Sequence, residues 1–332
     1  MNKSIKIIIN WVIGPLLAAW LFYSLYNQVK QQQGIYDGIL LIKQAPFGKQ
    51  APLFWLIVVL AFCNWGLESK KWQILINRLY PIKFFTAIKS VLSGVALSLN
   101  TPNRIGEYVG RVLFVQEGKR LQAVSLSMVG GIAQLTITML MGTLGLVVII
   151  TQMVDGEQLM GLSKIWLRTF TLFSFLGTAF LSLFFFKLSW LIRLIDKLPF
   201  AQKVEKYINI LENFDVKILL RLLFLSFLRY IIFVLQYVLM FKLLNVQVDF
   251  WQGFWAITVL FWVLAVVPTI AIAELGIRGK FAVALLNLYS NNIIGIIGTT
   301  FGIWFINLFI PAIIGSSLIL GKKIFFYTVF SA

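Results

Sequence analysis

The stretch SLNTPNRIGEYVGR, Ser98–Arg111, places three charges and two helix-breaking residues within a strongly apolar sequence. The uncharged run before it, residues 90–103, is too short to cross a bilayer, which requires about 20 apolar residues. Thr101 supplies an N-cap hydroxyl and Pro102 suits the first helical position, so a second helix is expected to begin here. The stretch therefore predicts two short helical arms joined by a charged break.

The charges of this break fall close to one helical face. Arg104, Glu107 and Arg111 stand at positions i, i+3 and i+7, and the last two are i,i+4 partners. A charge at membrane depth costs roughly 2.5–3.5 kcal/mol even on lenient scales, so it usually faces a cavity or another charge. We interpret the break as a substrate site, although the Glu107–Arg111 pair alone could serve only to make charges tolerable in lipid. The candidate substrate-binding residues here are Asn100, Thr101, Asn103, Arg104, Glu107 and Arg111.

The composition predicts an integral membrane protein. Hydrophobic residues make up 60% of the chain and the mean hydropathy is +0.89, against about 45–50% apolar residues in a soluble domain. The single cysteine, Cys63, excludes an intramolecular disulfide. With no histidine and no cysteine cluster, we expect no metal and no cofactor. The +17 net charge sits mainly in loops, which indicates topology signals and contacts to anionic lipid rather than nucleic acid.

Apolar runs divide the chain into spans and charged loops. A first run after Lys3 and Lys6 resembles a signal peptide, but its length favours an uncleaved span. The positive-inside rule places the basic loop 68–83, the loop 117–120, the charged loop 187–217 and both termini in the cytoplasm. The predicted spans are residues 7–29, 51–67, 121–154, 169–186, 222–241 and 293–320.

A second charged break repeats the design of the first. Pro268, Glu274 and Arg278 follow an apolar run that begins at Phe250, and a second apolar run follows them. Charge bias predicts that the hairpin 84–116 enters from the cytoplasm and that the second hairpin enters from outside. We add Glu274 and Arg278 to the candidate site. Arg229, within the span 222–241, either snorkels to the headgroups or points into the site.

The predicted fold is all-α. It is a polytopic helical membrane protein of about six spans and two re-entrant helical hairpins in an inverted repeat. The chain, residues 1–332, forms a single integral membrane domain with halves at about 51–154 and 218–320. Interrupted hydrophobic segments at matching positions indicate a substrate site near the midplane of secondary transporters. Broken helices also direct N-terminal N–H groups inward, which favours an anionic ligand.

Three motifs resemble a known family. Trp72-Gln-Ile-Leu75, Pro102-Asn-Arg-Ile-Gly-Glu107 with Arg111, and Leu275-Gly-Ile-Arg278 are similar to the lysylphosphatidylglycerol synthase transmembrane region, the flippase-like domain of the multiple peptide resistance factor. The third motif, in the second hairpin, departs from the family: Ala273-Glu274 replaces its usual Gly-Gly, and Gly279 replaces a glutamate.

The resemblance covers most of the chain. It implies a multi-pass protein of the bacterial inner membrane that moves a phospholipid or a polyprenyl-phosphate-linked lipid between leaflets. The aminoacyl-transferase activity of the family belongs to a separate soluble domain, which is not expected within these residues.

The expected function is therefore translocation of an anionic lipid. A secondary transporter of a small anionic solute, or a non-transporting membrane subunit of a lipid or glycan biosynthesis pathway, is the alternative. We expect no enzymatic activity, because each carboxylate of the two breaks has an arginine partner. The expected partners are an anionic-headgroup lipid as substrate and the bilayer itself, with no nucleic acid, and a homo-oligomer is left open.

Overall fold

The computed structural model describes residues 40, 43–99, 101, 104–153, 158–159, 162–187, 214–267 and 271–320, without the side chains of 158–162, 271–275 and 320. The predicted span 7–29 and residues 188–213 of the predicted loop 187–217 lie outside these residues. The described part is helical except for a two-residue antiparallel pair of strands. The elements are α4 (Ala51–Ile76), α5 (Phe84–Ser98), α6 (Gly106–Val112), α7 (Arg120–Gln152), β1 (Gln158–Leu159), β2 (Leu162–Ser163), α8 (Lys164–Phe186), α11 (Val216–Leu243), α12 (Phe250–Val266), α13 (Ala271–Leu286), α14 (Ile293–Trp304), the π-helix η4 (Phe305–Phe309) and α15 (Ile310–Leu320).

The described residues include five helices that are long and apolar enough to cross a membrane. These are α4, α7, α8, α11 and the run Ile293–Ile319, which joins α14, η4 and α15. Their lengths of 23 to 33 residues exceed the roughly 20 residues that a span requires. The prediction of a multi-pass helical membrane protein is therefore confirmed.

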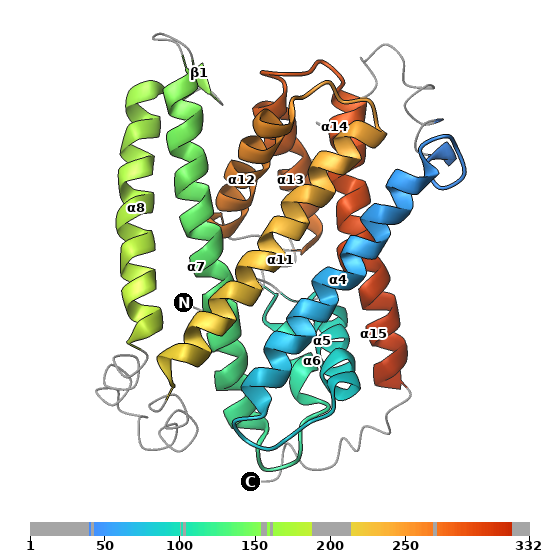
Figure 1. Ribbon diagram of the computed structural model, residues 1–332, viewed down its shortest axis with the longest axis vertical. Coiled ribbons are helices and arrows are strands. Elements are labelled where there is room, and N and C mark those ends of the chain that lie inside the picture. The colour runs from blue at the N-terminus through green and yellow to red at the C-terminus, as the bar shows by residue number, and fades with distance from the viewer. Residues whose placement is uncertain are drawn as a thin grey trace, which may run out of the picture.

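Two pairs of shorter helices occupy opposite ends of the bundle. Helices α5 and α12 have 15 and 17 residues, fewer than the roughly 20 residues that a membrane span requires. Helix α6 packs on α5, and α13 packs on α12. The first pair lies in the lower half of Figure 1 and the second pair in the upper half. Each charged stretch of the sequence thus belongs to one short pair.

Helix α4 continues beyond its predicted end. The sequence predicts that the span stops at Leu67 and that the charged residues 68–71 open a loop. The helix runs to Ile76 instead, and Glu68 and Lys71 are buried within it. The predicted boundary is wrong because partners from other helices satisfy these charges.

The turn between α5 and α6 also differs from its prediction. Helix α6 begins at Gly106 rather than directly after Thr101. The Thr101 hydroxyl nevertheless acts on this helix end, since it accepts a hydrogen bond of 2.7 Å from the Gly106 N–H. Arg104 adopts a left-handed backbone conformation with φ of 57°, which marks a strained turn.

Glycines allow the two arms of the first pair to meet at backbone contact. A Cβ atom at Gly110 would overlap the carbonyl oxygen of Ser93, and one at Gly106 would overlap that of Leu97. Close approach through small residues is typical of helix packing in membranes. This contact fixes α6, and with it Glu107 and Arg111, against α5.

Glycines also bring α7 and α12 into close contact. A Cβ atom at Gly142 would overlap the side chain of Trp262, and one at Gly145 would lie 2.9 Å from Thr258 Cγ2. The two glycines thus form a close packing surface between these helices.

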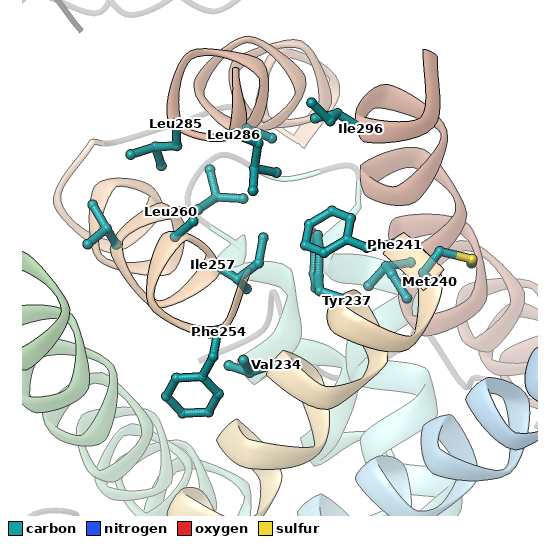
Figure 2. Packing of buried hydrophobic residues seen from close by; sticks show 14 of the residues in the cluster. Val234, Tyr237, Met240, Phe241, Phe254, Ile257, Leu260, Leu285, Leu286 and Ile296 are labelled. Atoms are coloured by element: carbon teal, nitrogen blue, oxygen red, sulfur yellow. The ribbon is translucent and has the colours of Figure 1, made fainter. Parts of the chain in front are cut away.

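The largest apolar core of the described residues lies where α11 meets the second short pair, α12 and α13. Figure 2 shows Tyr237 of α11 and Ile257 and Leu260 of α12 packed with Leu286 of α13. All four side chains are at most 1% exposed. This core holds α13, which carries Arg278, against α11.

Candidate functional site

A polar cavity of about 630 Å³ lies inside the bundle, between the two short pairs. Residues from α4, α5, α6, α7, α11, α13 and η4 line it, together with apolar and aromatic side chains from α12 and α14. Arg104, from the first charged break, and Arg278, from the second, line the same cavity. The charged lining residues are Glu68, Lys71, Arg104, Glu107, Arg111, Arg229 and Arg278.

Glu68 is the centre of the ion-pair network on one wall. Its carboxylate is almost fully buried and accepts from three cations. Lys71 Nζ and Arg229 Nη1 lie 2.8 and 2.6 Å from Oε2, and Arg111 Nη2 lies 2.6 Å from Oε1. A buried carboxylate is tolerated only with close partners of opposite charge, because desolvation costs several kcal/mol per ion. The network therefore ties α4, α6 and α11 together.

Arg111 is held by contacts on several sides. It pairs with both Glu68 and Glu107, and its guanidinium lies 5.5 Å from the ring centroid of Trp72. The Trp72 indole donates 2.8 Å to the Ser90 hydroxyl, which in turn donates to the Arg111 carbonyl. The predicted Glu107–Arg111 pair is formed. Arg111 also pairs with Glu68 of α4, a helix that the sequence patterns did not connect to this site.

Arg229 points into the site and forms specific contacts there. Its Nε donates 2.7 Å to Asn64 Oδ1, while Nη1 binds Glu68. The guanidinium also lies 5.3 Å from the ring centroid of Trp65, within cation–π range. Asn64 extends the chain of hydrogen bonds by donating 3.2 Å to Asn307 Oδ1, in the π-helix η4. Single-turn π-helices occur frequently at functional sites.

Arg278 reaches the cavity from the opposite short pair. Its Nη1 donates 3.0 Å to the phenolic oxygen of Tyr237, on α11. The side chain of Glu274 lies outside the described atoms, so its predicted pairing with Arg278 stays a prediction. Asn100 and Asn103 are likewise outside the described residues, whereas the neighbouring Thr101 is part of the turn that leads to α6.

The described side chains of the cavity carry an excess of positive charge. Five cationic and two anionic residues are among the described residues that line it. The buried donors of its lining that lack an acceptor among the described residues include Trp65 Nε1, Trp304 Nε1 and Arg111 Nε. Buried donors normally find partners, and leaving one unsatisfied costs about 1–3 kcal/mol. The site thus offers charge and hydrogen bonds to a ligand rich in anionic acceptors.

Sequence reasoning missed the residues at the centre of the network. Glu68, Lys71 and Asn64 lie on α4, where a charge cluster after an apolar run is typical of the end of a span. The available signal was the i,i+3 spacing of Glu68 and Lys71, which form an ion pair. Asn307, a lone amide within a long apolar run, gave a second weak signal.

Nothing in the described part of the chain resembles a metal centre. No group of three or more histidine, cysteine, aspartate or glutamate side chains gathers there. The site contains a small number of carboxylates, and each described one is engaged by cations.

Taken together, the fold and the cavity define a class: polytopic helical membrane proteins with a cavity between helices whose described lining carries more positive than negative charges. The sequence model described as the lysylphosphatidylglycerol synthase TM region matches residues 11–315. The chain belongs to this family of flippase-like membrane domains, and the expectation from its three motifs is confirmed. No curated protein matches the sequence.

Proposed function

We propose that the protein translocates an anionic lipid, a phospholipid or a polyprenyl-phosphate-linked lipid, between membrane leaflets. The observation that carries this proposal is the excess of positive charge in a cavity inside the bundle. A charged headgroup cannot cross hydrocarbon without such a polar environment, because an unpaired charge there is costly. Phosphate oxygens would accept hydrogen bonds from the arginines and from the indole N–H groups of Trp65 and Trp304.

The architecture supports movement rather than static binding. Two short helix pairs from opposite ends of the bundle contribute Arg104 and Arg278 to one cavity. We infer that these pairs are the re-entrant hairpins of an inverted repeat, with halves at about 51–154 and 218–320. Sites between such repeats can open alternately to the two membrane faces.

We further propose that the protein lies in the bacterial inner membrane, with cytoplasmic termini, and is not an enzyme. Glu68 and Glu107 are the carboxylates that line the cavity among the described side chains, and both are held in ion pairs. A catalytic base or nucleophile would need a freer group.

Native mass spectrometry tests the proposal. The protein is reconstituted in vesicles of equal phosphatidylglycerol and phosphatidylcholine, and the retained lipid is identified. Retention of phosphatidylglycerol, weakened in the Arg104→Gln and Arg278→Gln variants, supports the proposal. Equal retention of both lipids with release of a bound small anion would instead favour the transport of an anionic solute.

A further inference from the structure

A second cavity, of about 760 Å³, runs beside the charged one, and every residue that lines it is apolar or glycine. It is formed by α4, the first half of α5, the end of α11, and the continuous helix of α14, η4 and α15. Helices α4 and α15 border it at the right of Figure 1. We call it the apolar groove.

The apolar groove adjoins the charged cavity at a single aromatic side chain. Trp65 lines both spaces. Its ring lies 5.3 Å from the Arg229 guanidinium, which belongs to the charged network. Tryptophan commonly occupies such boundaries between a polar and an apolar region. A molecule with an anionic head and an apolar chain could therefore occupy both spaces at once.

The apolar groove opens sideways to the surface that faces lipid. Phe62 and Phe301, on opposite walls, are 70% and 49% exposed. Along α4 the groove runs from Phe54 to Gly66, which at 1.5 Å per residue is about 18 Å. Half of the hydrocarbon core of a bilayer is about 15 Å thick.

We infer that the apolar groove holds one acyl chain of an anionic phospholipid whose headgroup occupies the charged cavity, with Trp65 between the two. This inference rests on the proposed function and names its substrate class. The dimensions of the groove suit a single acyl chain, whereas a polyprenyl chain is much longer. The lateral opening lets the second acyl chain stay in the bilayer.

Gly66 provides a direct way to fill the apolar groove. It lines the groove, and a Cβ atom placed there meets nothing within 4 Å. The Gly66→Phe variant should therefore fold and occupy the space of the acyl chain, while Gly66→Ala should block it less. Gly177→Phe, on α8 and outside the groove, is the matched control, because its Cβ would make only an ordinary contact with Met139 Cε at 3.9 Å.

The experiment uses phosphatidylglycerol with a photoreactive diazirine on one acyl chain, reconstituted with the full chain. Mass spectrometry maps the adducts, and the same diazirine on phosphatidylcholine reports bulk lipid. We expect phosphatidylglycerol adducts at residues 58–66 and 301–306, lost in Gly66→Phe, reduced in Gly66→Ala and kept in Gly177→Phe. The phosphatidylcholine probe should label the groove much less.

Each of the following results would overturn the inference. Equal labelling of the groove by both probes means that it takes bulk lipid, and a Gly66→Phe variant that folds and keeps its adducts means that no chain lies there. Preferential retention of polyprenyl phosphate would assign a different lipid. If phosphatidylglycerol is retained through Arg278 but the groove stays unlabelled, only this inference fails. If the wild-type protein shows no preference for phosphatidylglycerol, the proposed function fails as well.

Discussion

Glu68 and Arg229 stand 161 positions apart in the sequence and form an ion pair of 2.6 Å inside the bundle. The carboxylate side chain is 3% exposed and the guanidinium side chain 15%. This pair connects α4 to α11 and forms part of the wall of the charged cavity. It explains why a helix can carry Glu68 and Lys71 at a depth where the sequence predicts a loop.

The first prediction concerns the stability of this network. Glu68→Gln removes the carboxylate that Lys71, Arg111 and Arg229 share, and it should cost roughly 3–5 kcal/mol because buried charges lose their partner. The melting temperature in detergent should fall clearly. Adding Lys71→Met should restore part of the loss, since one stranded charge disappears. The control is Glu117→Gln, whose side chain is 88% exposed and 3.6 Å from Arg120, and it should change stability by less than about 1 kcal/mol.

The second prediction is that lysine cannot replace Arg229. The guanidinium binds Asn64 through Nε and Glu68 through Nη1 while it lies over the Trp65 ring. A lysine ammonium keeps the charge but cannot keep this geometry. Arg229→Lys should lose about 1.5–3 kcal/mol of stability, the range for a hydrogen bond to a charged group. A melting temperature equal to that of the wild-type protein would show that the charge alone matters.

The third prediction separates binding from structure at Arg278. If this side chain binds the ligand, Arg278→Gln should weaken retention of phosphatidylglycerol by about 1.5–3 kcal/mol with a modest loss of stability. Tyr237→Phe removes the observed acceptor of Arg278 and tests whether that hydrogen bond alone causes the effect. If Arg278 serves only to pair with Glu274, stability should fall strongly and Glu274→Gln should restore it. A double variant that retains lipid normally would contradict the binding role.

The fourth prediction concerns the backbone contact within the first short pair. Gly110→Ala places a methyl group onto the Ser93 carbonyl, so α6 must move and carry Glu107 and Arg111 with it. Both stability and lipid retention should fall. Gly177→Ala, on α8, adds only an ordinary contact with Met139 and should leave both stability and lipid retention unchanged. Equal results for the two variants would show that α6 tolerates displacement.

The fifth prediction is the topology. In a background with Cys63→Ser, cysteines at Lys83 and Lys119 should label from the cytoplasmic face, and a cysteine at Asp249 from the opposite face. Lys119 Nζ donates 3.1 Å to the Leu79 carbonyl, which places both ends of the first short pair together. Labelling of positions 83 and 119 from opposite faces would show that the segment between them crosses the membrane once and is not a re-entrant hairpin.

Sequence patterns predict the uncharged helices α7 and α12 well, and the reason is local. The uncharged run 121–154 corresponds to α7, Arg120–Gln152, and the run from Phe250 to Val267 corresponds to α12, Phe250–Val266. Hydrophobic length alone determines such segments in a membrane. The Glu107–Arg111 pair was predicted for the same reason, because i,i+4 partners are read directly from the sequence.

The rest of the site depends on contacts between distant segments. The local sequence predicts that a span ends at Glu68. The helix continues because Arg111 of α6 and Arg229 of α11 pair with this carboxylate. The interpretation of Arg229 stayed open between snorkelling and binding because its partner Asn64 is 165 positions away. The apolar groove beside the cavity is not visible in any local pattern, since its walls come from helices at both ends of the chain.

The central claim is that the charged cavity carries an anionic headgroup across the membrane, and transbilayer movement measures it most directly. Vesicles with the reconstituted protein contain phosphatidylglycerol labelled with a dithionite-sensitive fluorophore, with and without an imposed membrane potential. We expect the wild-type protein to let dithionite reduce nearly all of the label, whereas protein-free vesicles keep the inner-leaflet fraction. The double variant Arg104→Gln/Arg278→Gln is first shown to be folded by its melting temperature. Vesicles that contain it should then keep the inner-leaflet fraction of the label, as protein-free vesicles do. Movement by this variant at the wild-type rate, or no movement by the wild-type protein under either condition, would contradict the account.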